Sequence, residues 1–402
     1  MKLKYWALCL SCCFYGNLSY TQIYTAGETY FSDQQYIEFQ TGNFPLIISA
    51  PHGGILKPEE IPDRDCSGCV YTRDTRTQEL ARFLAEAIQE EIGCFPHLVI
   101  NRLHRSKLDA NRDLMEASDS NEETAPYWEA YHDWIKLARD SVTKYFGKGL
   151  FLDIHGHGHN IQRVEIGYLL SGSTLRRNDF DLDNGAFADQ SSIRSLAGGL
   201  EQNLSFSELI RGDDSFGTLL EDRSYPSVPS VIDLSPSSGD SYFSGGFNTR
   251  TYGSIEEGKI DAIQLEFNFQ GVRDSDSNVK KVAEELAEVV LVYLKKHYFS
   301  DLSSNSCMLS TNTTSSFNEP KVNIYPNPNQ GVWMLRFPKT FPASGQGSIR
   351  LVSMQGQVVL SQTFQQPIKE WQVQRADLSP GIYVLQMLEG TEVYTRKVVI
   401  GK

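Results

Sequence analysis

The sequence has little of what a membrane-spanning or nucleic-acid-binding protein needs. Its 402 residues include no internal apolar run of about 20 residues, the length that a transmembrane helix requires. Basic residues are also few, since 37 Lys and Arg stand against 50 Asp and Glu and give a formal net charge of −13. An acidic chain is poorly suited to binding nucleic-acid phosphates or anionic lipid. We therefore expect no transmembrane segment and no nucleic-acid partner.

Cysteine is sparse as well, and three of the seven cysteines lie in the first 13 residues. There, an apolar stretch at 5–14 follows two lysines, and small residues precede Gln22 at positions −3 and −1. This pattern is typical of a secretory signal peptide. We predict a signal at 1–21; the alternative is a buried first helix or strand. Cys66 and Cys69 form only half of a zinc knuckle, so in an exported protein we expect a local disulfide between them.

Residues 22–300 alternate between strand-like and helix-like segments. Short apolar runs predict buried strands at 45–50, 97–100, 149–154, 165–170 and 262–269. Apolar residues with helical spacing predict amphipathic helices at 77–92, 127–146 and 279–298. This alternation predicts an α/β domain with a mixed central sheet flanked by helices.

The composition changes after residue 300. Residues 301–319 are mostly Ser, Thr and Asn, which predicts a flexible linker. Residues 320–402 then show seven short alternating apolar segments separated by Gly-, Asn- and Pro-containing turns. We predict a small all-β sandwich domain there.

Histidines follow two of the predicted strands. His52 stands in SAPHGG (49–54), and His155, His157 and His159 stand in FLDIHGHGHN (151–160). Binding crevices of open α/β sheets form beyond the carboxyl ends of strands, and zinc prefers imidazole and carboxylate ligands. We predict that His52 and His155 bind zinc, and that the other two histidines support the ligands, face the substrate or lie on the surface.

Acidic residues complete the predicted metal site. Asp74 and Glu79, at the start of the helix at 77–92, are rival third ligands, although Asp74 can instead cap that helix. Asp153 would orient His155 from the same strand face. Glu266 lies inside the apolar segment IQLEFNF, where a carboxylate usually has a partner or a task. We predict a general base; the alternative is a buried salt bridge with Arg273.

The charged segment NRLHRSKLDANRD (101–113) is by default a solvated face. Because it follows a predicted strand, one of its arginines can instead stabilise an oxyanion or clamp a substrate carboxylate.

Five motifs together resemble the N-formylglutamate amidohydrolase family over about residues 40–300: SAPHGG, RDTRTQELA, HRSKLDANRD, FLDIHGHGH and IQLEFNF. The resemblance implies a zinc carboxypeptidase-like fold, zinc held by His52, Asp74 and His155, and Glu266 as the base. DANRD is similar to the DANR segment of zinc carboxypeptidases, which implies that Asn111 and Arg112 bind substrate and that Arg102 or Arg105 polarises the scissile carbonyl. Those enzymes have a glutamate three residues after the first histidine, where this chain has Ile55, so Asp74 and Glu79 both remain open.

The C-terminal region resembles a type A sorting domain of the Bacteroidetes type IX secretion system, through VNIYPNPNQGVWMLRF, LVSMQGQVV, LSPGIYVLQM and RKVVI. It implies that the secretion machinery is a partner and that the protein is secreted or held at the cell surface. We thus expect a secreted zinc-dependent hydrolase that cleaves an amide bond of an N-acylated amino acid or peptide with an activated water. The alternative is a non-catalytic surface binding protein on a retired hydrolase scaffold.

Overall fold

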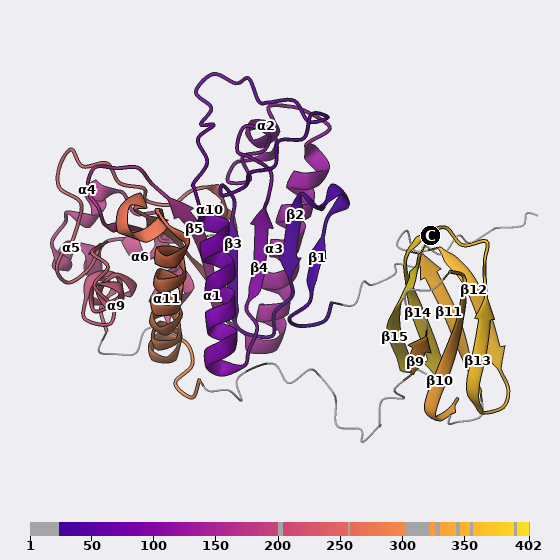
Figure 1. Ribbon diagram of the computed structural model, residues 1–402. Helices are drawn as coiled ribbons and strands as arrows, with labels where there is room; N and C mark the ends of the chain where they lie inside the picture. The colour runs from indigo at the N-terminus through magenta and orange to yellow at the C-terminus, as the bar shows by residue number, and fades with distance from the viewer. Residues whose placement is uncertain are drawn as a thin grey trace, which may run out of the picture. The chain divides into compact units, whose positions relative to one another are not determined.

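The computed structural model describes residues 24–199, 204–255, 258–302, 307, 322–325, 330–342, 346–353, 357–389 and 392–401. These residues fall into two compact units, one at 24–311 and one within 312–402, and Figure 1 shows both. The predicted signal peptide lies outside the described residues, as does most of the predicted linker.

The first unit is built on an eight-stranded mixed sheet with the order β1-β2-β4-β3-β5-β8-β6-β7. Its centre is parallel, because β4, β3, β5 and β8 pair in that sense, whereas β2 with β4 and β6 with β8 are antiparallel. The strands are β1 Thr29–Phe31, β2 Ile37–Gln40, β3 Leu46–Ala50, β4 His97–Asn101, β5 Gly149–Gly156, β6 Val164–Gly167, β7 Ser227–Val228 and β8 Ile260–Phe267.

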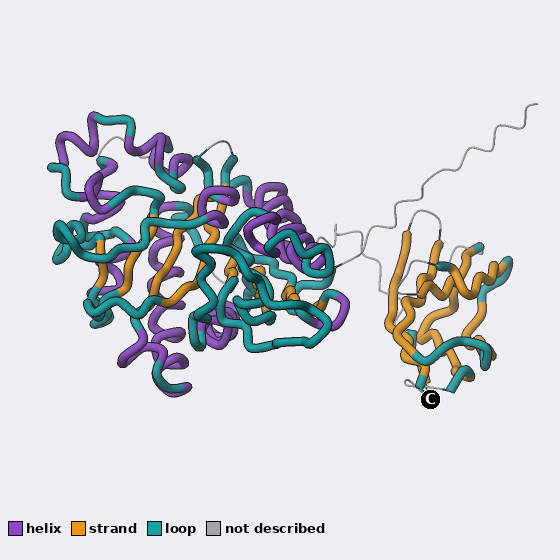
Figure 2. Tube along the Cα trace, turned by 90° about the horizontal axis from the view of Figure 1, so that it is seen from above, coloured by secondary structure: helices purple, strands orange, loops and turns teal. Residues whose placement is uncertain are grey.

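Helices cover both faces of this sheet, which Figure 2 shows in a view from above. Neighbouring residues of a strand point to opposite faces, so Leu46 and Ile48 pack with α1 and α11, whereas Ile47 packs with α3. The helices are α1 Thr77–Ile92, α2 Leu114–Ser118, α3 Ala125–Phe146, α4 Gly172–Leu175, α5 Asp179–Asn184, α6 Phe187–Gln190, α7 Arg194–Gly198, α8 Phe206–Arg211, α9 Phe216–Glu221, α10 Phe247–Tyr252 and α11 Asp276–His297, with short irregular turns η1 Asp33–Gln35 and η2 Phe269–Arg273.

The second unit consists of two antiparallel sheets among its described residues, with the orders β13-β10-β9 and β12-β11-β14-β15. Apolar residues from both sheets, including Trp333, Leu351 and Leu385, form one buried cluster between them. The strands are β9 Asn323–Tyr325, β10 Val332–Phe341, β11 Gly347–Ser353, β12 Val358–Phe364, β13 Ile368–Gln374, β14 Gly381–Glu389 and β15 Glu392–Ile400. The predicted fold class, a mixed α/β sheet plus a small all-β unit, is confirmed. No helix in the described part of the chain has the length and apolar character needed to cross a membrane.

Two disulfides join parts of the first unit. One links Cys66 to Cys69, the pair expected from the sequence. The other links Cys94, two residues after the end of α1, to Cys307. Residue 307 belongs to the segment predicted as a linker, so the first unit reaches further along the chain than residue 300, and Leu302 and Cys307 both pack against its core.

We predict that a chain ending at Thr311 is more stable than one ending at Ser300. The longer chain keeps the Cys94–Cys307 bond, which spans 213 residues and can contribute up to about 5 kcal/mol by restricting the unfolded state. Thermal unfolding of the two chains measures the difference. Reductant, or Cys307→Ser in the longer chain, should remove this difference in melting temperature. Equal melting temperatures for the two oxidised chains would show that the bond adds no stability.

Candidate functional site

The candidate site lies where the central strands end. His155 is the seventh residue of β5, and its partner in the parallel register with β8 is Glu266. Asp153 and His155 share the strand face of Phe151, because successive side chains alternate. Ser49 of β3 is the register partner of Asp153 and donates to it at 2.5 Å. The register of the sheet therefore places Glu266, the predicted base, beside His155, a predicted metal ligand.

His52 is placed by a tight turn after β3. A Cβ added at Gly54 would lie 2.1 Å from the carbonyl oxygen of Leu103, so only glycine permits this approach of two backbones. Asn101, at the end of β4, donates its side-chain amide to the carbonyls of Pro51 and Leu108. This buried asparagine ties the turn that carries His52 to the loop that follows β4.

Asp74 lies in the same place, just before α1. Its Oδ2 atom is 3.4 Å from Nδ1 of His52 and 3.3 Å from Nδ1 of His155, and it accepts from the backbone N–H of Gly156. The residue at the N-cap of α1 is Arg76, not Asp74, so Asp74 does not act as a helix cap. Glu79 is outside the group of three residues that the structure brings within 4.8 Å, His52, Asp74 and His155.

Each imidazole is held from behind by a second carboxylate. Nε2 of His52 is 2.6 Å from Asp109, and Nε2 of His155 is 2.8 Å from Asp153. These pairs leave both Nδ1 atoms directed at Asp74, and Nδ1 of His52 is buried without a hydrogen-bond partner. A carboxylate behind a histidine fixes the ring and the tautomer in many metal sites.

The charges in this buried cluster shift its proton equilibria strongly. Burial opposes ionisation of Asp74 and Asp109, but the charges of the neighbouring histidines outweigh it and hold the pKa of both carboxyls well below the usual range. Burial lowers the pKa of His155, yet Asp153 reverses this and raises that pKa well above its ordinary value. Burial also raises the pKa of Glu266, against the opposing effect of His155.

The donor atoms fit a zinc ion. Two imidazole nitrogens and one carboxylate oxygen are a common ligand set for catalytic zinc, which leaves a fourth position open. With bonds of about 2.0–2.1 Å, the ligand atoms of a tetrahedral ion are roughly 3.3–3.4 Å apart, and the two Nδ1–Oδ2 distances here are 3.4 and 3.3 Å. The unpartnered Nδ1 of His52 would gain a bond there.

Glu266 lies beside this group. It is buried, its Oε1 accepts from Gln264 at 2.9 Å, and the same oxygen is 3.9 Å from Nδ1 of His155. Arg273, the alternative partner, donates instead to the carbonyls of Thr75, His157 and Phe267. Arg273 thus joins three backbone segments around the site.

Only some of the residues predicted to bind substrate or to polarise its carbonyl lie in the cluster. Arg105 is inside the cluster, with Nε 2.9 Å from Asp109 and Nη1 3.7 Å from Asp74. Asn111 is buried with its Nδ2 3.5 Å from Nε2 of His155, and its oxygen accepts from the backbone of Asn248.

The other two arginines have partners outside the cluster. Arg112 pairs with Glu116 at 2.8 Å and is about one-third exposed. Arg102 donates to the carbonyl of Gln35 and lies over the ring of Phe31. The structure therefore brings Arg105 and Asn111 to the site and does not bring Arg102 to it.

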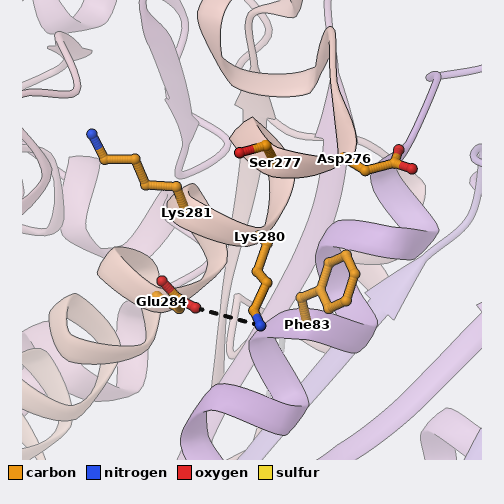
Figure 3. Close-up of a pocket in the computed structure, with 6 residues that line it drawn as sticks. All are labelled: Phe83, Asp276, Ser277, Lys280, Lys281 and Glu284. Carbon is orange, nitrogen blue, oxygen red and sulfur yellow. Dashed lines mark ion pairs between the residues drawn. The ribbon is translucent and has the colours of Figure 1, made fainter.

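A separate surface pocket lies between α1 and the start of α11 (Figure 3). It contains the ion pair of Lys280 with Glu284 but none of the predicted site residues. Its lining is Phe83, Asp276, Ser277, Lys280, Lys281 and Glu284.

Comparison with known proteins identifies the second unit. Residues 323–401 match the family model described as a secretion system C-terminal sorting domain. This stretch is a sorting domain. The resemblance predicted from the turn and strand motifs of this region is thereby confirmed, and the chain carries a signal for a secretion system at its C-terminal end.

The first unit is similar to two solved structures. A gene product from Agrobacterium tumefaciens is 13% identical with a TM-score of 0.41, and the match covers 66% of this chain and 98% of that one. An N-formylglutamate amidohydrolase from Ralstonia eutropha is 12% identical with a TM-score of 0.41, covering 65% and 97%. No curated protein matches the chain in sequence.

We predict that Asp74→Asn removes most bound zinc, whereas Glu79→Gln leaves zinc content unchanged. Asparagine keeps the shape of Asp74 but removes the charge that a cation between two imidazoles needs. Metal analysis of the purified full-length variants measures this, and circular dichroism checks that each is folded. Zinc loss in Glu79→Gln alone would make Glu79 the ligand. In the wild-type chain, zinc affinity should fall as pH falls, because protons compete for both Nδ1 atoms.

Proposed function

We propose that the unit at 24–311 is a zinc-dependent hydrolase that cleaves an amide bond of an N-acylated amino acid or a peptide. One observation carries the proposal: Nδ1 of His52, Nδ1 of His155 and Oδ2 of Asp74 converge, with Glu266 beside them. A site that combines a carboxylate–histidine ligand set with an adjacent buried carboxylate is suited to hydrolysis by water. Its position beyond the carboxyl ends of parallel strands is where α/β sheets bind ligands.

Zinc bound by His52, Asp74 and His155 would supply Lewis-acid chemistry, making water more acidic and a carbonyl more electrophilic. The surrounding residues of the chain orient the ligands. Asp109 and Asp153 hold the imidazoles so that Nδ1, not Nε2, faces the metal position. They also keep negative charge behind the ligands, which raises ligand basicity.

Glu266 is the general base of the proposal. Its carboxylate takes a proton from the attacking water as the bond to the amide carbon forms. The same carboxyl group then gives the proton to the amine that leaves. Burial raises the pKa of Glu266 above its ordinary value, which makes it a stronger base and a group able to return the proton near neutral pH.

Arg105 and Asn111 are the substrate-orienting residues of the proposal. The guanidinium of Arg105 is buried beside Asp74 and Asp109, so its charge is fixed near the reacting carbonyl and stabilises the oxygen that becomes negative. Asn111 is packed against Gly246, where a Cβ would lie 2.4 Å from its Nδ2. Its amide is thus held in one orientation, while Arg112, about one-third exposed, can approach a substrate carboxylate from outside.

Export follows from the sorting domain at 323–401. We propose that the type IX machinery recognises this domain after a signal peptide at 1–21 has directed the chain across the inner membrane. The enzyme would then act outside the cell or at its surface. External peptides, cell-wall peptides and N-acylated amino acids are the amides that fit this location.

A binding protein on a retired hydrolase scaffold is the competing function. Such a protein has no need for both a ligand set and a base, so the convergence of His52, Asp74 and His155 with Glu266 beside them favours the enzyme. Zinc content and turnover together separate the two functions. A stoichiometric zinc with hydrolysis of an amide supports the enzyme, whereas absence of both favours the binder.

We predict that Glu266→Gln lowers turnover by roughly 10²–10⁴-fold while zinc stays bound. Glutamine keeps the size and the contact with Gln264 but cannot accept the proton of water. Steady-state kinetics on an amide panel measures turnover, and metal analysis measures zinc. Glu79→Gln, a carboxylate of the same unit outside the cluster, is the matched control and should keep full turnover. Unchanged turnover in Glu266→Gln would remove this residue from the mechanism.

We predict that removing residues 312–402 abolishes delivery to the cell surface but preserves hydrolysis by the purified protein. All the proposed site residues lie in the unit at 24–311, so the chemistry needs nothing from the sorting domain. Fractionation of host cells, with antibody detection, measures delivery. Surface delivery of the truncated chain would refute the export proposal, and loss of activity in a folded truncated chain would place part of the active site in the second unit.

A further inference from the structure

A second group of histidines and an acid lies next to the proposed metal site. His157, His159 and Glu165 have ligand atoms within 4.8 Å of one another. Nε2 of His157, however, donates to the carbonyl of Arg163 at 2.8 Å, and its Nδ1 accepts from the backbone N–H of His159 at 3.1 Å. Both nitrogens of His157 are therefore engaged, and the group does not offer three free ligands to a metal.

Glu165 instead bonds the ring of one residue, His159, and the backbone of a second, Phe243, beside the proposed base. It is fully buried, one oxygen is 2.8 Å from Nδ1 of His159, and the other accepts from the backbone N–H of Phe243 at 2.8 Å. The imidazole of His159 stacks on the ring of Phe243, with centroids 4.7 Å apart and planes 19° apart. Glu165 is also the cross-strand partner of Glu266 in the pairing of β6 with β8. The two rings thus lie next to the reacting position.

The stacked rings are fixed in place and open to solvent. The loop that carries Phe243 is anchored by Arg163, which pairs with Asp233 at 2.8 Å and with Asp240 at 3.5 Å. The side chain of Phe243 is nevertheless 44% exposed, and no described residue bonds Nε2 of His159. An exposed ring stacked on an imidazole that a buried carboxylate holds, next to the proposed base, is a preformed binding surface.

We propose that His159 and Phe243 form a substrate subsite, here called the aromatic shelf, that binds a planar or large apolar group next to the scissile amide. The inference rests on the proposed function and names its substrate class. Stacking on flat rings favours aromatic groups, and the carboxylates of Glu165 and Glu266 disfavour an acidic group there. The substrate is thus an N-acylated amino acid or peptide with an aromatic or large apolar group, rather than a dicarboxylate.

The test measures binding separately from turnover. Four N-acyl amino acids carry a phenyl ring on the acyl side, on the amine side, on both sides or on neither. Calorimetry gives their dissociation constants with the zinc-loaded, full-length Glu266→Gln chain. A ring in one of the two positions should tighten binding about tenfold or more. Phe243→Ala in the same background should remove that gain, and Phe243→Tyr should retain it.

Phe180→Ala is the matched control, because Phe180 is a 74% exposed ring on α5 and its loss should leave the preference unchanged. Equal affinity for the four amides, or a gain that survives Phe243→Ala, overturns the aromatic shelf. The proposed hydrolase function is judged by zinc content and turnover of the wild-type chain. Ring-dependent binding without turnover would keep the aromatic shelf and refute the hydrolase, and turnover without ring preference would do the reverse.

Discussion

The organisation of the first unit depends on one buried electrostatic arrangement: the carboxylate of Asp74 between the Nδ1 atoms of His52 and His155. Burying charges costs several kcal/mol per ion unless each is paired or bound to a metal. The surrounding structure meets that requirement with a carboxylate behind each ring and with Arg105 beside Asp74. Removal of any one partner would leave a buried charge without compensation, so these residues act as a unit. A cluster of buried charges lowers stability unless every charge is compensated. Such clusters are therefore expected mainly at functional sites.

Two features of the backbone position this cluster: the register of the strands and the close approach of backbone segments at glycines. The parallel pairing of β5 with β8 sets His155 beside Glu266. Gly54 permits the turn of His52 to touch the chain after β4, and a Cβ at Gly156 would lie 2.1 Å from Cζ of Arg273. Because backbone geometry sets these distances, the fold itself positions the side chains, as the proposed catalysis by fixed charges requires.

Sequence reasoning succeeded where the signal is local. The spacing of apolar residues predicted α1 with the bounds that the structure has, and the two strand-end histidines emerged from their position after apolar runs. It missed Asp109, because a carboxylate within a charged segment is indistinguishable from a solvated one until the fold buries it. It left Arg102 and Arg105 as rivals near the substrate, and only the fold shows that the side chain of Arg102 donates to the carbonyl of Gln35 while Arg105 lies in the cluster. The bond from Cys94 to Cys307 is also invisible in the sequence, since a pairing across 213 residues has no local pattern.

The two histidine groups show how hydrogen-bond accounting separates a ligand site from a structural one. Both combine two imidazoles with one carboxylate at similar distances. In the first, Nδ1 of His52 is buried without a hydrogen bond, which costs free energy unless a ligand compensates. In the second, His157 has both nitrogens engaged with the backbone and fixes the loop instead. Residue type and spacing alone make the groups equivalent. The Nδ1 of His52, without a hydrogen bond and directed at Asp74, is what makes the first group the better candidate for the proposed metal.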